Sequence, residues 1–269
     1  SVRIRAFVNI ASVGTTSILL GGELKGLYYS NEDVAVECIE SNRDLVVGVK
    51  VRASNDVGGE NAPEALRRAR RVADRVKLPL MVHLGPAPAT IDEIADTLRA
   101  GDIITHAFTG WEGNTVVADG VLRPSIRAAR DRGVLLDIGH GMSGFSSAVA
   151  RSMIELGELP DTISSDLHTY SQTKVIDLPT VLAKFMALGM SLEDVLARAT
   201  LAPARAAGLD ALGVGTLAPG APADIAVFRL DSRAMAFGDG FGSEFQGEQA
   251  ITPVLTVIDG TVAFRSGDA

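Results

Sequence analysis

Short apolar runs alternate with amphipathic, helix-like segments between residues 3 and 209. Strands that lack the apolar/polar alternation of a half-exposed strand are typical of parallel sheets covered by helices. Six such runs suit either a (β/α)-barrel or a doubly wound sheet. No GxGxxG follows any of them, so the dinucleotide-binding form of the second fold lacks its usual support. The six runs cover residues 3–11, 45–52, 80–83, 103–106, 134–137 and 162–166.

Helix starts are marked at two places. Ser30 with Asp33, and Thr90 with Glu93, have the spacing of a capping box, in which a hydroxyl and a carboxylate bond reciprocally to the first turn. The two pairs predict helices that begin just after residues 30 and 90.

The pattern changes after Leu209. A stretch rich in Gly and Pro at 213–220 leads into strand-like segments at 223–228 and 254–264, the second of which contains an Asp-Gly turn signal. Strands that follow one another without helices indicate antiparallel pairing. We therefore predict a barrel domain over residues 1–209 and a small β-sandwich portion over 210–269.

Composition excludes several classes of function. The 269 residues carry a net charge of −8, which disfavours nucleic acid as a partner. No apolar run reaches the roughly 18 residues of a membrane span, so we expect no membrane partner and a cytoplasmic location. A single cysteine, Cys38, cannot form an internal disulfide, and its helix-like surroundings predict a buried, inert thiol.

All four histidines lie at or just beyond the ends of predicted strands. His83 and His106 end two successive runs, His140 lies just beyond the next, and His168 follows the last. A single histidine at a strand end is more often structural. Four at equivalent ends indicate the rim where barrel enzymes place their sites. We expect His83 and His106 to bind metal, and His140 and His168 to contact substrate or support the ligands.

Lys50 and Asp166 complete the candidate metal site. Lys50 interrupts an apolar strand, where an inward lysine must lose its charge, find a partner or react. Asp166 ends a buried strand, and its carboxylate needs a cation. Imidazole and carboxylate ligands suit Zn, Mn, Fe or Co. Arg52, just beyond Lys50, has the bidentate fork that suits a substrate carboxylate.

The strand ends resemble strands four, five, six and eight of the amidohydrolase superfamily barrel, and the later chain resembles that family's passage into its β-sandwich. Asp-Ile-Gly-His-Gly at 137–141 is most similar to the amidohydrolase/deacetylase metallohydrolase group, near dihydroorotase. The segments that carry the resemblance are 49–52, 82–83, 105–106, 165–168, 200–209 and 215–227.

This resemblance implies a full set of roles. Lys50 would be carboxylated by CO₂ and bridge two divalent metals, with zinc the expected ion. His83 and His106 would bind the second metal. Asp166 would bind the first metal and relay a proton between the attacking water and the leaving group.

One part of the family pattern is missing. The His-x-His pair that ends strand one of the family barrel is absent, as are strands one and two. At about 30 residues per βα unit, with sandwich strands added, we expect roughly 100 residues upstream of Ser1. The segment alone is therefore expected neither to close its barrel nor to hold the first metal.

The predicted reaction is hydrolysis of an amide or ester bond in a small acyl or cyclic-amide substrate by a metal-activated water. A homo-oligomer is compatible with this prediction. Two alternatives stay open: a Schiff-base lyase that uses Lys50 as its nucleophile, and a non-catalytic barrel scaffold. Metal content separates them, because only the hydrolase should bind about two equivalents.

Overall fold

The computed structural model describes residues 2–14 and 22–267, and the chain forms two compact units. The N-terminal unit is Ile4–Asp137, and the C-terminal unit is Ile138–Ala269 with Ser1–Arg3. The predicted domain boundary after Leu209 lies inside the C-terminal unit and stays a prediction. Among the described residues, no helix has the length and apolar character to cross a membrane.

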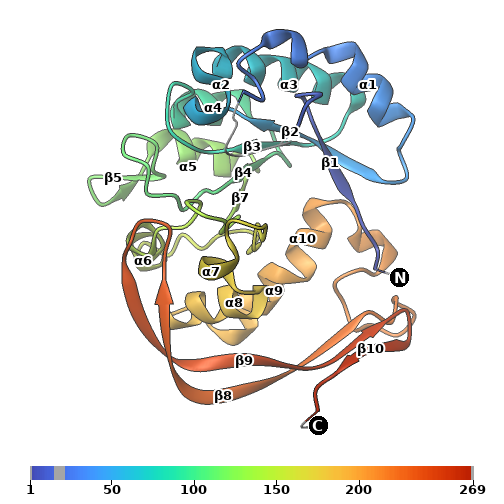
Figure 1. The fold of residues 1–269 in the computed structure, drawn as a ribbon, viewed down its shortest axis with the longest axis vertical. Helices are drawn as coiled ribbons and strands as arrows, with labels where there is room; N and C mark the ends of the chain where they lie inside the picture. The colour runs from blue at the N-terminus through green and yellow to red at the C-terminus, as the bar shows by residue number, and fades with distance from the viewer. Residues whose placement is uncertain (1, 15–21, 268–269) are drawn as a thin grey trace. The chain divides into compact units, whose positions relative to one another are not determined.

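The N-terminal unit is built on a five-stranded sheet, ordered β1-β2-β3-β4-β7, in which every neighbouring pair is parallel. Helices α1 and α3 pack against each other and against this sheet (Figure 1). The predicted parallel α/β architecture is confirmed. The elements are β1 (Ala6–Asn9), η1 (Leu27–Tyr29), α1 (Glu32–Glu40), β2 (Val46–Arg52), α2 (Asn55–Gly58), η2 (Gly59–Asn61), α3 (Ala62–Val76), β3 (Leu80–His83), α4 (Ile91–Thr97), β4 (Ile103–Thr105), β5 (Val117–Ala118), β6 (Val121–Leu122), α5 (Pro124–Asp131) and β7 (Leu135–Asp137).

The two predicted helix starts have different outcomes. At α4 the capping box is present, because the Thr90 hydroxyl accepts from the Glu93 N–H and the Glu93 carboxylate accepts from the Thr90 N–H. At α1 the predicted cap is wrong by one residue. Asn31 caps the helix by accepting from two N–H groups of the first turn, while the Ser30 hydroxyl donates to the Leu27 carbonyl of the preceding 3-10 turn.

The prediction of a buried Cys38 is also wrong, because its thiol is exposed. The residues of α1 that face the interior are Ala35 and Ile39, four positions apart. Successive helical residues point about 100° apart, so Cys38, which directly precedes Ile39, is turned away from the buried stripe.

The C-terminal unit contains an antiparallel sheet ordered β10-β9-β8, with α8 packed on β9 (Figure 1). The predicted Asp259–Gly260 turn joins β9 to β10, and both residues have the positive φ of a type I′ hairpin turn. The elements are α6 (Ser147–Glu155), α7 (Gln172–Val175), α8 (Leu178–Ala187), α9 (Leu192–Ala199), α10 (Leu201–Ala206), η3 (Asp210–Leu212), β8 (Ile225–Gly238), β9 (Glu244–Ile258) and β10 (Thr261–Arg265).

The sixth predicted strand, at 162–166, does not form a regular strand. The N–H groups of Ile138, His140 and Gly141 donate to carbonyls of 162–165, at 3.2, 3.1 and 3.0 Å. In a parallel ladder the N–H donors of one strand are two residues apart, as Ile138 and His140 are. Gly141 directly follows His140, so the third bond breaks this alternation. The segment is therefore held in place by backbone bonds without the geometry of a strand.

Candidate metal centre

Polar side chains line the carboxyl ends of four neighbouring strands in the N-terminal unit. The strand register pairs Arg52 with His83, His83 with Thr105, and Thr105 with Asp137. Lys50 lies two residues before Arg52, so its side chain points to the same face of the sheet. These residues share one rim because the strands are parallel.

His83 and His106 lie side by side, with ring centroids 4.5 Å apart and planes at 79°. Burial holds the pKa of His83 well below its ordinary value, and the nearby His106, Arg52 and Lys50 lower it further. His83 is therefore neutral near pH 7, which is the form that binds metals.

The backbone at His106 has an uncommon conformation. Its φ is +62°, in the left-handed region, and only 7% of the residue is exposed. Residues other than glycine seldom adopt such angles, and those that do cluster at functional sites. The turn directly after β4 thus sets the ring of His106 beside His83.

Arg52 is held by a carboxylate that the sequence did not reveal. Its guanidinium lies 2.9 Å from Glu23, which is 5% exposed and also accepts a hydrogen bond from Asn9. No sequence pattern marks Glu23, which lies in an irregular segment before the first predicted helix.

A tight space lies beside the ring of His83. A methyl group added to Gly85 would come within 2.9 Å of His83 Nε2 and 3.2 Å of Ser54 Oγ. The buried Ser54 hydroxyl has no hydrogen-bond partner among the described residues. The neutral imidazole, its close neighbour His106 and this hydroxyl fit a divalent metal with nitrogen and oxygen ligands. Within residues 2–14 and 22–267, no group of three or more His, Cys, Asp and Glu side chains is arranged to hold a metal by itself.

Asp166, in the C-terminal unit, is also in the left-handed region, with φ +44°. Its carbonyl accepts from the buried Ser171 hydroxyl at 3.1 Å. Its carboxylate lies against Gly141, where a Cβ would be 2.3 Å from Oδ2. Two of the four predicted metal ligands, Asp166 and His106, therefore have left-handed backbone conformations.

His140 is fully buried, and both of its ring nitrogens have partners. Nε2 lies 2.8 Å from Lys184 Nζ, and Nδ1 lies 3.1 Å from the Gly141 carbonyl. Burial and, after it, the charge of Lys184 lower the pKa of His140 to about 4. Lys184 was not among the predicted site residues.

His168 lies near Asp166 in the chain and is part of the same turn. Its Nδ1 accepts from the Tyr170 N–H at 3.3 Å, and its own N–H donates to the Ser171 hydroxyl at 3.0 Å. The substrate-contact roles predicted for His168, His140 and Arg52 stay predictions.

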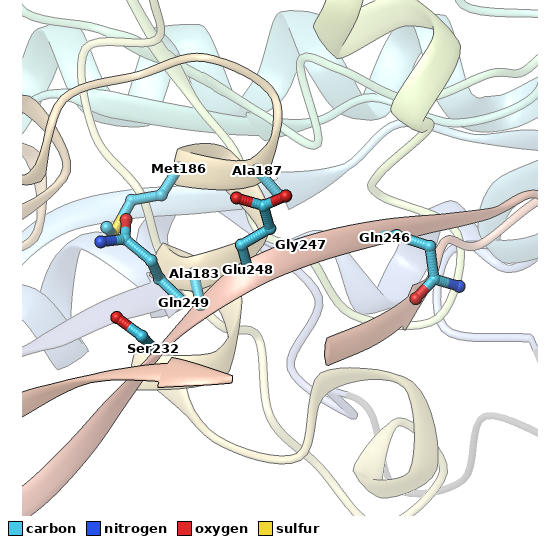
Figure 2. Close-up of a pocket in the computed structure, with 8 residues that line it drawn as sticks. All are labelled: Ala183, Met186, Ala187, Ser232, Gln246, Gly247, Glu248 and Gln249. Atoms are coloured by element: carbon cyan, nitrogen blue, oxygen red, sulfur yellow. The ribbon is translucent and has the colours of Figure 1, made fainter. Parts of the chain in front are cut away.

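A separate cavity in the C-terminal unit contains none of the predicted residues. It has a volume of about 520 Å³ and lies between α8 and the strands β8 and β9 (Figure 2). Its polar lining comes from the strands, and α8 contributes only apolar side chains. The lining residues are Ala183, Met186, Ala187, Ser232, Gln246, Gly247, Glu248 and Gln249.

Comparison with known proteins decides the family. The model of the amidohydrolase family matches residues 11–263, which is nearly the whole chain. The chain belongs to the amidohydrolase family. A deacetylase of Brucella anthropi and one of Agrobacterium fabrum are each 34% identical over 257 residues, which is 95% of this chain and 63% of each relative. The chain therefore spans less than two thirds of these relatives.

Solved structures agree with this family assignment. A dihydroorotase has a TM-score of 0.88 and 33% identity, over 98% of this chain and 69% of that one. An adenine deaminase has a TM-score of 0.91 and 30% identity, over 97% of this chain and 71% of that one. The resemblance to the amidohydrolase family and the predicted barrel class are confirmed.

Proposed function

We propose that this chain carries the metal-binding and proton-transfer residues of a metal-dependent hydrolase, which cleaves an amide or ester bond in a small acyl or cyclic-amide substrate. The observation that carries the proposal is the contact between His83 and His106 at the rim of a parallel sheet. The deacetylase names of two relatives favour an acyl substrate.

Four side chains would hold one or two metal ions. His83 and His106 supply imidazole nitrogens, and Asp166 supplies a carboxylate. Lys50 Nζ would add to CO₂ with loss of a proton, which gives a carbamate whose oxygens bind cations. Zinc suits this donor set. A bound metal of this kind lowers the pKa of water and polarises a carbonyl.

The remaining chemistry belongs to the side chains. Asp166 would accept the proton of the attacking water and deliver it to the leaving group, acting first as general base and then as general acid. Arg52, already oriented by Glu23, would bind a substrate carboxylate through its second edge. His140 and His168 stay predicted substrate contacts, and a cytoplasmic location and a homo-oligomer also stay predictions.

Metal analysis of the full-length protein tests the proposal. His83→Ala and His106→Ala should each lose about one equivalent of metal, together with hydrolysis of N-acyl and O-acyl acids. His168→Ala, which removes an imidazole outside the proposed ligand set, should keep the wild-type metal content. Wild-type stoichiometry in both ligand variants would refute the metal assignment. If the metal-free wild-type protein instead forms an imine between Lys50 and a carbonyl substrate, which borohydride traps as a stable adduct, the alternative of a Schiff-base lyase is favoured.

A further inference from the structure

The side chain of Lys184 occupies an unusual position in the C-terminal unit. It lies in the last turn of α8, and only 1% of it is exposed. An ammonium has three donors and no acceptor. Nζ lies 2.7 Å from the Lys174 carbonyl, 2.8 Å from the Gly238 carbonyl and 2.8 Å from His140 Nε2. All three donors are therefore satisfied, as burial of the charge requires.

This arrangement fixes the ring of His140. Because Lys184 can only donate, Nε2 of His140 must accept, and the ring proton lies on Nδ1. Nδ1–H then donates to the Gly141 carbonyl. The ring also stacks on Phe145, with centroids 4.8 Å apart and planes at 25°. With both nitrogens and one face engaged, the ring has a single orientation.

Gly141 connects this ring to Asp166. Its carbonyl accepts from His140, its N–H donates to the Ser165 carbonyl at 3.0 Å, and its Cα lies against the carboxylate of Asp166. The two peptide groups on either side of the Gly141 Cα are thus both held by hydrogen bonds. A shift of either group would move the Cα against which the Asp166 carboxylate lies.

The other end of the network is anchored by the hairpin between β8 and β9. Asp239 is buried and accepts from the N–H and hydroxyl of Ser147, each at 2.9 Å. The Gly240 N–H donates to the Phe145 carbonyl at 2.9 Å. These bonds tie the hairpin tip to the start of α6 and fix the Gly238 carbonyl that Lys184 binds.

We propose that Lys184 and His140 are positioning residues that fix the carboxylate of Asp166, and that the β8–β9 hairpin thereby contributes to the geometry of the site. The catalytic meaning of this network rests on the proposed function, since it assumes that Asp166 transfers protons. The positioning itself does not depend on that assumption. In this proposal His140 acts on Asp166 through Gly141, and this positioning role replaces the substrate contact that the sequence predicts for His140.

Crystal structures of the metal-free full-length protein test the positioning directly. The variant is Lys184→Met, which keeps the length of the side chain and removes all three donors. The control is Lys25→Met, which removes a lysine charge at an exposed position. In Lys184→Met the His140 ring should rotate away from the Gly141 carbonyl, and Asp166 should occupy more than one rotamer. An unchanged ring and a single unchanged Asp166 conformer would overturn the proposal, whatever reaction the protein catalyses.

Kinetics and spectroscopy then test the consequence. A displacement of about 1 Å at a reacting group can lower the rate by about 10²-fold. Lys184→Met should therefore lower kcat by about that factor with little change in KM. It should also alter the visible spectrum of the cobalt-substituted protein, while Lys25→Met matches wild type in both. A variant with wild-type kcat and spectrum would refute the link to Asp166.

A second variant covers the case in which Lys184→Met does not fold. His140→Phe keeps an aromatic ring stacked on Phe145 but removes the bond to the Gly141 carbonyl. The same loss in kcat and the same Asp166 disorder are expected. If His140→Phe raises KM alone and leaves Asp166 ordered, His140 is a substrate contact and the proposal fails.

Discussion

Replacing Gly141 with alanine should misplace the carboxylate of Asp166. The new Cβ would lie 2.3 Å from Oδ2, more than 1 Å short of the 3.4 Å at which ordinary contact begins. Gly141 also has φ +46°, where a side chain is strained by about 1–2 kcal/mol. Two effects are therefore expected: a modest loss of stability from the backbone, and a displaced carboxylate.

Gly157→Ala separates these two effects. Gly157 has φ +75° just after α6, and a Cβ there would have no heavy atom within 4 Å. It carries similar backbone strain without any clash, so both variants should lose about 1 kcal/mol in urea-induced unfolding. Only Gly141→Ala should lower kcat, by about 10²-fold if Asp166 moves by about 1 Å.

The assay is steady-state hydrolysis by the full-length protein, using an acyl substrate that the wild type cleaves. Metal content is measured in parallel, so that a loss of metal is not mistaken for a lost proton transfer. Equal kcat values in the two variants would refute the reasoning, because they would show that the contact with Gly141 does not set the position of the carboxylate.

Two further experiments test individual roles. Lys50 should show density beyond Nζ in a metal-loaded crystal, and activity should depend on bicarbonate during reconstitution, because an uncharged or ammonium nitrogen cannot bridge cations. An unmodified Nζ beyond hydrogen-bonding distance of every metal would contradict this. Asp166→Asn should keep the fold but lower kcat by about 10²–10⁴-fold, since an amide does not relay protons. Near-normal turnover would remove Asp166 from the mechanism.

The rim of the sheet could be read from the sequence because parallel strands in register align their ends. The strands that end at Arg52, His83 and Thr105 end in the same row of the sheet, and the predicted runs ended there to within one residue. The sixth run could not be read in this way. Ile163 is the one apolar residue of that run, and the sequence does not show that Gly139 and Gly141, both with positive φ, interrupt the neighbouring segment.

Lys184 was missed although the sequence carried a signal. Residues 181–185 of α8 are all buried, so the helix is enclosed on more than one face at this point. A lysine in such a run cannot reach water by leaning to one side, and it must be paired. Its partners come from distant parts of the chain, so their identity required the structure. The sequence predicted only the start of β8 and the end of β9. Their full lengths were missed because long stretches of β8 are exposed on both faces and lack the alternation that marks a half-buried strand.

The positive φ of Asp166 allows a test of whether the backbone is strained at this residue. Asp166→Gly and Asp166→Ala both remove the carboxylate, so their difference in stability reports the backbone alone. Glycine relieves about 1–2 kcal/mol of strain but loses about 0.5–1 kcal/mol through its freedom in the unfolded chain. In the metal-free protein Asp166→Gly should therefore be more stable than Asp166→Ala by about 0.5–1 kcal/mol. At the exposed helical residue Glu37 in α1, the order should reverse, since glycine has no strain to relieve there.

Urea midpoints of the four variants, glycine and alanine at positions 166 and 37, decide the question. If alanine is the more stable residue at both positions, the φ of +44° at Asp166 carries no strain, and the carboxylate sits where the backbone would place it without any demand from catalysis.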